Sequence, residues 1–161
     1  MSSHHYKTTT TWTGNRGQGT SEYKAYERSH TISMAGKPDI SGSSDPVFRG
    51  DKTKHNPEDF FVSSLSTCHM LQYLHLCAVN GVVVIEYIDH ATGTMEEDGK
   101  GGGHFTEVVL KPVVTVKEKR MIEKANALHD DAHKLCFIAS SVNFPVRHKP
   151  VAVVPELEEK N

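Results

Sequence analysis

Two of the three cysteines in this sequence, Cys68 and Cys136, are the residues best suited to chemistry. Cys68 lies within a long apolar segment, between Thr67 and His69. A thiolate is the reactive form of cysteine, and a position inside a helix gains nothing from a helix N-terminus, so an ionised Cys68 needs a nearby cation. The alternative is a buried structural thiol, because free cysteine is among the most buried residue types.

Cys136 follows a predicted helix and precedes a polar connector, where we expect a thiol to be accessible and mobile. One cysteine in a rigid helix and another at a helix end suit a peroxidatic and resolving pair. The first would attack a peroxide and become a sulfenic acid, and the second would condense with it to a disulfide. Cys77 lies nine residues after Cys68. That spacing is about 13 Å along a helix and half a turn away, so we expect Cys77 in the core.

A metal site is the competing arrangement. His129, His133 and Cys136 are spaced i, i+4 and i+7, on one face of a helix, and Cys68 or His69 is available as a fourth ligand. Such a set suits tetrahedral zinc. No Cys-x-x-Cys pair accompanies these residues, so a zinc-binding module stays the alternative. The cysteine pair itself needs neither a metal nor an organic cofactor, and we expect none.

Length and composition bound the class of protein. The 161 residues suit one domain over 1–161, with mobile ends at 1–5 and 155–161. A net charge of -2 gives no global electrostatic reason to bind nucleic acid or an anionic membrane surface, and we expect neither partner. There is no transmembrane run of apolar residues and no secretory signal in residues 1–12. We therefore expect a cytoplasmic protein, in which structural disulfides are rare and cysteines tend to be buried, metal-bound or reactive.

The pattern of residues predicts strands at 6–13 and 21–34, then a loop over 35–55. Asn56, Pro57 and Asp59 together are typical of a helix start, with Asp59 completing a capping box. The helix should run to Asn80 and stop at Gly81. Because it is apolar on most faces, we expect it to be the buried central helix.

The second half of the chain predicts a hairpin, a helix and a last strand. The hairpin covers 82–97 and 104–116 with a turn at 98–103, the helix covers 119–135, and the last strand covers 148–154. Apolar residues of the helix fall on one face, at Ile122, Ala125, Leu128 and Ala132. This order predicts an α+β fold with antiparallel sheets.

Several motifs resemble the OsmC/Ohr family, the osmotically inducible and organic hydroperoxide resistance proteins. They are Asn56–Asp59 (NPED), Ser64–His69 (SLSTCH), the apolar helix, and a late cysteine in Leu135–Val146 (LCFIASSVNFPV). The resemblance runs over residues 6 to 154. It implies an OsmC-like fold, an intertwined homodimer, and a peroxidase that reduces organic hydroperoxides with a dithiol, of the lipoyl type in Ohr-like members.

The resemblance also implies roles for individual residues. Cys68 would be the peroxidatic cysteine and Cys136 the resolving one. Glu58 would be the family's glutamate, which holds an arginine in place. That arginine would be Arg49 by the OsmC pattern or Arg16 by the Ohr pattern, and we prefer Arg49.

Two features of the sequence bear on these roles. Phe137 stands where the family usually has proline after the resolving cysteine. Glu58 and Cys68 are ten residues apart, about 15 Å on one continuous helix, which a glutamate side chain does not span. A shared site therefore needs a bend in the chain or a Glu58 from a second subunit. A non-catalytic thiol sensor or partner-binding dimer with the same fold is a further alternative.

Overall fold

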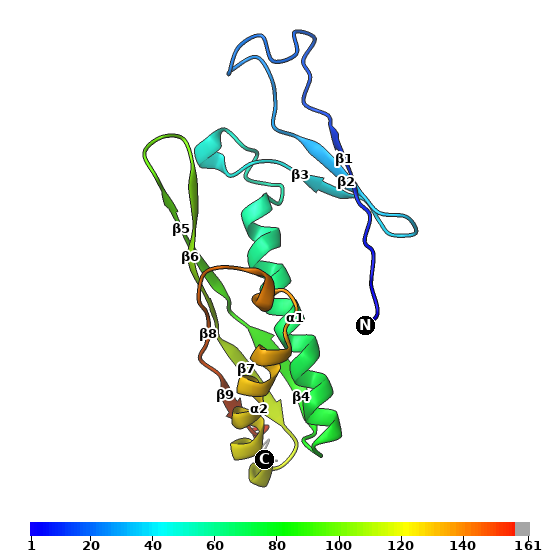
Figure 1. The fold of residues 1–161 in the computed structure, drawn as a ribbon, viewed down its shortest axis with the longest axis vertical. Coiled ribbons are helices and arrows are strands. Elements are labelled where there is room, and N and C mark those ends of the chain that lie inside the picture. Colours follow the sequence, from blue (N-terminus) through cyan, green and yellow to red (C-terminus); the bar gives the residue numbers. More distant parts are fainter. Residues whose placement is uncertain (157–161) are drawn as a thin grey trace, which may run out of the picture. The chain divides into compact units, whose positions relative to one another are not determined.

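The computed structural model describes residues 1–156 (Figure 1). By its internal contacts the chain divides into two compact units, Met1–Phe61 and Val62–Asn161. The prediction of a single domain over 1–161 stays a prediction, and most of the expected mobile end at 155–161 lies outside the described residues. None of the described helices has the length and apolar character needed to cross a membrane.

The first unit contains a small antiparallel sheet in the order β1-β2-β3. Its strands are β1 (Thr9–Trp12), β2 (His30–Ser33) and β3 (Ile40–Gly42), and a 3-10 turn, η1 (Pro46–Phe48), follows. β1 confirms the strand predicted at 6–13. The strand predicted over 21–34 is wrong for its first part, and the loop predicted over 35–55 contains β3 and η1.

Local stacking explains why the strand predicted over 21–34 forms only at its end. The guanidinium of Arg28 lies 4.4 Å from the ring centroid of Tyr23 and 4.1 Å from that of Tyr26. The same guanidinium donates hydrogen bonds to the carbonyl oxygens of both tyrosines, at 2.8 Å and 2.7 Å. These contacts fold the segment back on itself, which removes its backbone from the extended conformation that a ladder needs.

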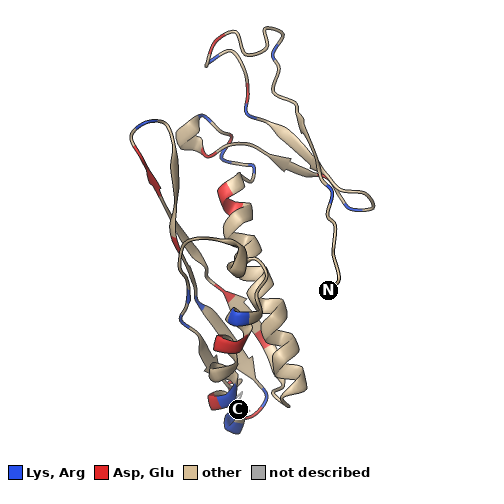
Figure 2. Ribbon diagram, in the orientation of Figure 1, with Lys and Arg blue, Asp and Glu red and all other residues tan. Residues whose placement is uncertain are grey.

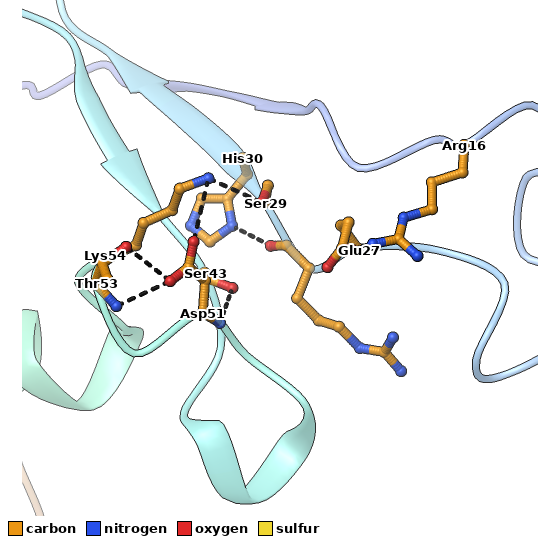
Figure 3. Close-up of polar contacts among 9 residues, drawn as sticks. Arg16, Glu27, Ser29, His30, Ser43, Asp51, Thr53 and Lys54 are labelled. Atoms are coloured by element: carbon orange, nitrogen blue, oxygen red, sulfur yellow. Dashed lines mark hydrogen bonds and ion pairs between the residues drawn. The ribbon is translucent and has the colours of Figure 1, made fainter.

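A polar cluster holds the segment after β3 (Figure 3). The Lys54 ammonium donates to the Ser29 hydroxyl at 2.9 Å, and the backbone N–H of Asp51 donates to the Ser43 hydroxyl at 3.0 Å. Ser43 is 1% exposed, so its hydroxyl needs this partner. Hydrogen bonds from Thr53 hold the pKa of the Asp51 carboxyl below its usual range.

Helix α1 (Pro57–Val79) begins and ends as the sequence predicts. The Asn56 side chain accepts the backbone N–H of Asp59 at 2.8 Å, and the Asp59 carboxylate accepts that of Asn56 at 3.3 Å. This reciprocal pair is the capping box, which satisfies two N–H groups that a helix start leaves free. Gly81, with φ of 72°, takes the left-handed conformation that ends the helix.

One stripe of α1 is buried within the chain. It consists of Leu65, His69, Tyr73 and Cys77, spaced four residues apart. Leu71 and Val79 on other faces are 63% and 65% exposed. Beyond its acidic first turn the helix carries no Lys, Arg, Asp or Glu (Figure 2). The helix therefore presents apolar side chains that no other described part of this chain covers.

The second unit contains the predicted hairpin, broken into two pairs of strands. β4 (Val84–Asp89) pairs with β7 (Pro112–Val116), and β5 (Thr92–Glu97) pairs with β6 (Gly103–Leu110), both antiparallel. The break falls where the Asp89 carboxylate accepts the backbone N–H of Lys111 at 2.7 Å. Pro112 follows and has no N–H for the ladder.

The last strand predicted, 148–154, is two short strands. β8 (Val146–His148) extends the β5-β6 sheet and β9 (Val151–Val153) extends the β4-β7 sheet, each in parallel to its neighbour. Each of these two sheets therefore contains the expected antiparallel pair and one parallel edge strand. The α+β fold class is confirmed.

Helix α2 (Ile122–Leu135) packs on β9 and β7, as Figure 1 shows, after a 3-10 turn, η2 (Lys119–Met121). Ala125, Leu128 and Ala132 are buried and join the main apolar core, as predicted. That core also receives Tyr73 and Cys77 from α1. A second core cluster forms around Leu65, Val108 and Leu110.

Candidate active site

Cys68 lies in the middle of α1 and is partly exposed. The hydroxyl of Ser66, two residues earlier, donates to the Asp89 carboxylate at 2.5 Å, which ties this part of the helix to β4. Leu65, one turn earlier, is fully buried in the second core cluster. Cys68 therefore sits on a rigid support with its thiol still within reach of solvent.

Cys136 is the residue that caps the C-terminal end of α2. Its sulfur accepts the backbone N–H of Ala139 at 3.4 Å, and its carbonyl accepts the backbone N–H of Ser140 at 3.0 Å. The 3-10 turn η3 (Ala139–Ser141) thus folds back over the cysteine. Cys136 is 1% exposed, so the expectation that it is accessible is wrong. The physical reason is this turn, which the polar composition of the connector conceals.

The structure brings the two sulfurs together. The Cys68 thiol lies close enough to that of Cys136 to act on its pKa. Burial first, and the neighbouring Cys68 thiol second, raise the pKa of the Cys136 thiol to about 11, although the N–H of Ala139 acts in the opposite direction. Cys136 is therefore protonated at neutral pH and can donate its hydrogen to the Cys68 sulfur. The two thiols are unequal, because Cys68 is accessible to a small molecule and Cys136 is enclosed.

Cys77 belongs to the core, as the sequence predicts. It is 1% exposed and belongs to the same apolar core cluster as Tyr73. Burial raises the pKa of this thiol, which makes it a poor nucleophile.

The arginine candidates lie in the first unit and differ in their partners. Arg16 forms an ion pair with Glu27 (Figure 3). Arg49 is exposed, and within the described part of the chain it forms no ion pair. Its guanidinium lies 5.9 Å from the centroid of the Tyr23 ring. The backbone of Arg49 has φ of 66°, a conformation uncommon outside glycine. Of the two, Arg49 is the arginine whose charge is free to meet another group.

Glu58 lies in the first turn of α1 and is half-buried. Among residues 1–156, no ion pair joins it to Arg49 or Arg16. The structure thus places Cys68 and Cys136 together, but does not join the candidate glutamate to either candidate arginine. The roles of all five residues stay predictions.

The proposed zinc ligands are not gathered by the fold. In the described chain no three His, Cys, Asp or Glu side chains are placed to hold a metal ion. The Nδ1 atom of His129 lies 2.9 Å from Nε2 of His69, and the Cys136 sulfur faces Cys68 and Ala139. Since the histidines pair with each other and Cys136 lies against Cys68, the proposed ligands do not converge on one point, and the zinc-binding alternative is not supported.

Sequence reasoning missed the role of His69 and His129 in the core. The two rings are 1% and 0% exposed. A pattern that points to this was available, because His129 falls on the same helical face as Ala125, Leu128 and Ala132.

Comparison with known proteins bears on the family. The family model described as OsmC-like protein matches residues 50–150, a range that contains both reactive candidates. The chain belongs to the OsmC-like family. Among solved structures, an OsmC-like protein of unknown function from Vibrio cholerae O1 biovar eltor is 30% identical, with a TM-score of 0.83. That match covers 92% of this chain and 100% of the other.

Two more distant structures share the OsmC-like fold. An organic hydroperoxide resistance protein OsmC from Legionella pneumophila is 16% identical, with a TM-score of 0.66 over 93% of this chain and 98% of that one. An organic hydroperoxide resistance protein from Elizabethkingia anophelis is 18% identical, with a TM-score of 0.65 over 94% of this chain and 99% of that one. No curated protein matches the sequence.

Proposed function

We propose that this OsmC-like protein is a thiol-dependent peroxidase that reduces organic hydroperoxides to alcohols. The observation that carries the proposal is the contact between an accessible thiol, Cys68, and an enclosed thiol, Cys136. The names of the Legionella and Elizabethkingia structures, organic hydroperoxide resistance proteins, support the same substrate class.

The chemistry divides into three balanced steps. The Cys68 thiolate attacks the terminal oxygen of ROOH, the O–O bond breaks, and the alkoxide takes a proton to leave as ROH. The resulting Cys68 sulfenic acid then reacts with the Cys136 thiol, which forms the disulfide and releases water. A dithiol finally reduces the disulfide by exchange and is itself oxidised to a disulfide. A lipoyl-type dithiol is the reductant we favour.

In this scheme the burial of Cys136 keeps its thiol from reacting with the peroxide itself. A thiol with a raised pKa and no access to solvent does not compete for peroxide, because only the thiolate is a good nucleophile. Its position against the Cys68 sulfur means that the sulfenic acid forms beside its partner. Rapid closure then protects Cys68 from oxidation to sulfinic acid.

Arg49 and Glu58 complete the proposed site. Arg49 would stabilise the Cys68 thiolate and orient the peroxide through charge-assisted hydrogen bonds, and Glu58 would orient the guanidinium. The unpaired charge of Arg49 and its left-handed backbone support this assignment, since strained residues gather at functional sites. Arg16, already paired with Glu27, is less suited.

The active form would be an intertwined homodimer. Support comes from α1, which is apolar on most faces yet leaves Leu71 and Val79 exposed in the single chain. A helix of that composition is normally buried on all faces. In a dimer, the Glu58 of one subunit would serve the Cys68 of the other. A cytoplasmic location stays a prediction.

Steady-state turnover of cumene hydroperoxide with dihydrolipoamide, monitored as alcohol formed, tests the proposal. Continuous turnover that disappears in Cys68→Ser is the expected result. A protein that forms the Cys68–Cys136 disulfide once but is not recycled by any dithiol is a thiol redox sensor, the second candidate function.

A further inference from the structure

Two buried histidines join the helices that carry the two reactive cysteines. His69 of α1 and His129 of α2 are 1% and 0% exposed, and Nε2 of His69 lies 2.9 Å from Nδ1 of His129. This is the distance of a hydrogen bond between ring nitrogens. The remaining nitrogen of each ring is buried and has no hydrogen-bond partner in the described chain. The contact between the two rings is therefore the only hydrogen bond that either buried imidazole makes within the described chain.

Aromatic and polar groups from three elements surround the pair. From α1, the Tyr73 ring stacks on His129 with centroids 3.8 Å apart, and its hydroxyl donates to the Ala125 carbonyl at 3.0 Å. From β8, the His148 ring lies 5.6 Å from that of His69 and is bonded to Asp130 of α2 at 2.7 Å.

The last titratable ring nearby is that of His133, one turn beyond His129 on α2, which lies 5.6 Å from the His148 ring. Burial lowers the pKa of His69 to about 4 and that of His129 to about 3, with repulsion between the rings acting in the same direction. Both imidazoles are therefore neutral at neutral pH, so one ring donates a hydrogen and the other accepts it.

The sequence positions of the two histidines connect them with the sulfurs. His69 directly follows Cys68 on α1, and His129 lies seven residues before Cys136 on α2. Seven residues are two helical turns, or about 10 Å of rise, so His129 and Cys136 lie on the same side of α2. The histidine bond thus joins the two helices close to the place where they bring the sulfurs together.

We propose that His69 and His129 are positioning residues that hold Cys136 in register with Cys68 for disulfide closure. The proposal rests on the function proposed above. Apolar packing between Ala125, Leu128 and the α1 stripe is non-directional and tolerates small rotations of α2. A hydrogen bond between two buried rings restricts both distance and angle. Closure needs that restriction because a disulfide requires an S–S distance of about 2.05 Å and a defined dihedral angle.

Single-turnover oxidation separates the two steps. Reduced protein is mixed with one equivalent of cumene hydroperoxide; alcohol release reports the first step, and quenched-flow mass spectrometry reports the Cys68–Cys136 disulfide. His129→Phe keeps a ring beside Tyr73 but removes the bond to His69. We expect closure to slow about tenfold, with a longer-lived sulfenic acid at Cys68, while alcohol release in the first turnover changes less than about twofold.

Two further variants make the test specific. His129→Asn places a polar atom where Nδ1 of His129 stands, so we expect closure within about threefold of the wild-type rate. His133→Asn is the matched control on the same helix, and we expect closure at the wild-type rate. Should His129→Phe fail to fold, His69→Leu removes the bond from the α1 side.

The outcomes separate the two proposals. Wild-type closure rates in the variants that lack the bond would overturn the positioning role, as would equal losses in His129→Asn and His129→Phe. Absence of alcohol release in the wild-type protein would instead overturn the peroxidase function. If every variant that lacks the bond fails to fold, closure in His129→Asn that is at least tenfold slower than in the wild type, with sulfenic acid persisting at Cys68, would still contradict the role.

Discussion

The Cys136 thiol is 1% exposed and yet lies close enough to the Cys68 thiol for that group to raise its pKa. The Cys68 sulfur is partly exposed to solvent, whereas the Cys136 sulfur is enclosed by Cys68 and by the turn at Ala139. This asymmetry assigns the order of reaction, because a peroxide can reach Cys68 before it can reach Cys136. The predictions below begin from this relationship.

Replacement of each cysteine should give a different defect. Cys68→Ser should remove peroxidase turnover altogether, since the other two thiols, of Cys77 and Cys136, are buried and out of reach of a peroxide. Cys136→Ser should release one equivalent of alcohol as the sulfenic acid forms and a second as excess peroxide oxidises it to sulfinic acid, because nothing traps the sulfenic acid. Intact-protein mass spectrometry after one and ten equivalents of cumene hydroperoxide distinguishes the two. Cys77→Ser is the control, and full turnover in Cys68→Ser would contradict the mechanism.

The two arginine candidates should separate in kinetics. Arg49→Ala should lower the second-order rate of Cys68 with cumene hydroperoxide by about 10²-fold, the size of effect seen when a charge-stabilising donor is removed from an active site. Arg16→Ala removes a side chain paired with Glu27 and should change that rate less than about threefold. Stopped-flow measurement under pseudo-first-order conditions gives both values. The reverse order of effects would favour Arg16.

A charge on the exposed face of α1 should disrupt assembly. Leu71 is 63% exposed in the single chain, and a second copy of α1 would cover it. Leu71→Lys should therefore shift sedimentation velocity from dimer to monomer and lower peroxidase activity together. Leu71→Ala, which removes volume but adds no charge, should remain dimeric. Wild-type protein that sediments as a fully active monomer would contradict both the dimer and the proposed role of Glu58 across it.

Acid should destabilise the fold through the histidine pair. Burial holds the pKa of His69 at about 4 and that of His129 at about 3, below the ordinary value of about 6.5 for an exposed histidine. Below pH 6.5 the unfolded chain binds more protons than the folded one, so the free energy of unfolding falls as the pH falls towards 4. The expected loss between pH 7 and pH 4 is about 3 kcal/mol for each histidine, or about 6 kcal/mol for the pair.

Urea denaturation at pH 7, 5.5 and 4.5 measures this loss. The variant His69→Gln/His129→Asn has no titrating ring at either position and should lose less stability over the same range. A carboxylate with lowered pKa, such as Asp51, loses its stabilising effect only nearer to pH 4 and is unchanged in the variant. An identical pH dependence in the two proteins would mean that the buried pair is not the group that titrates.

Local interactions made much of this fold predictable from the sequence. The limits of α1 follow from the Asn56–Asp59 capping box and from Gly81, contacts that span only a few residues. The apolar face of α2 and the hairpin follow from periodicity for the same reason. The family motif around Cys68 and the expectation that Cys77 is structural were also within reach of the sequence alone.

Only the tertiary structure decided how distant segments meet. The turn that encloses Cys136, the parallel addition of β8 and β9, and the bond between His69 and His129 all join residues that are separated along the chain or whose backbone is irregular. Such contacts depend on the packing of the whole core rather than on local propensity. For that reason the sequence identified both cysteines. The exposure of Cys68 and the burial of Cys136, which set their proposed order of reaction, follow only from three-dimensional packing.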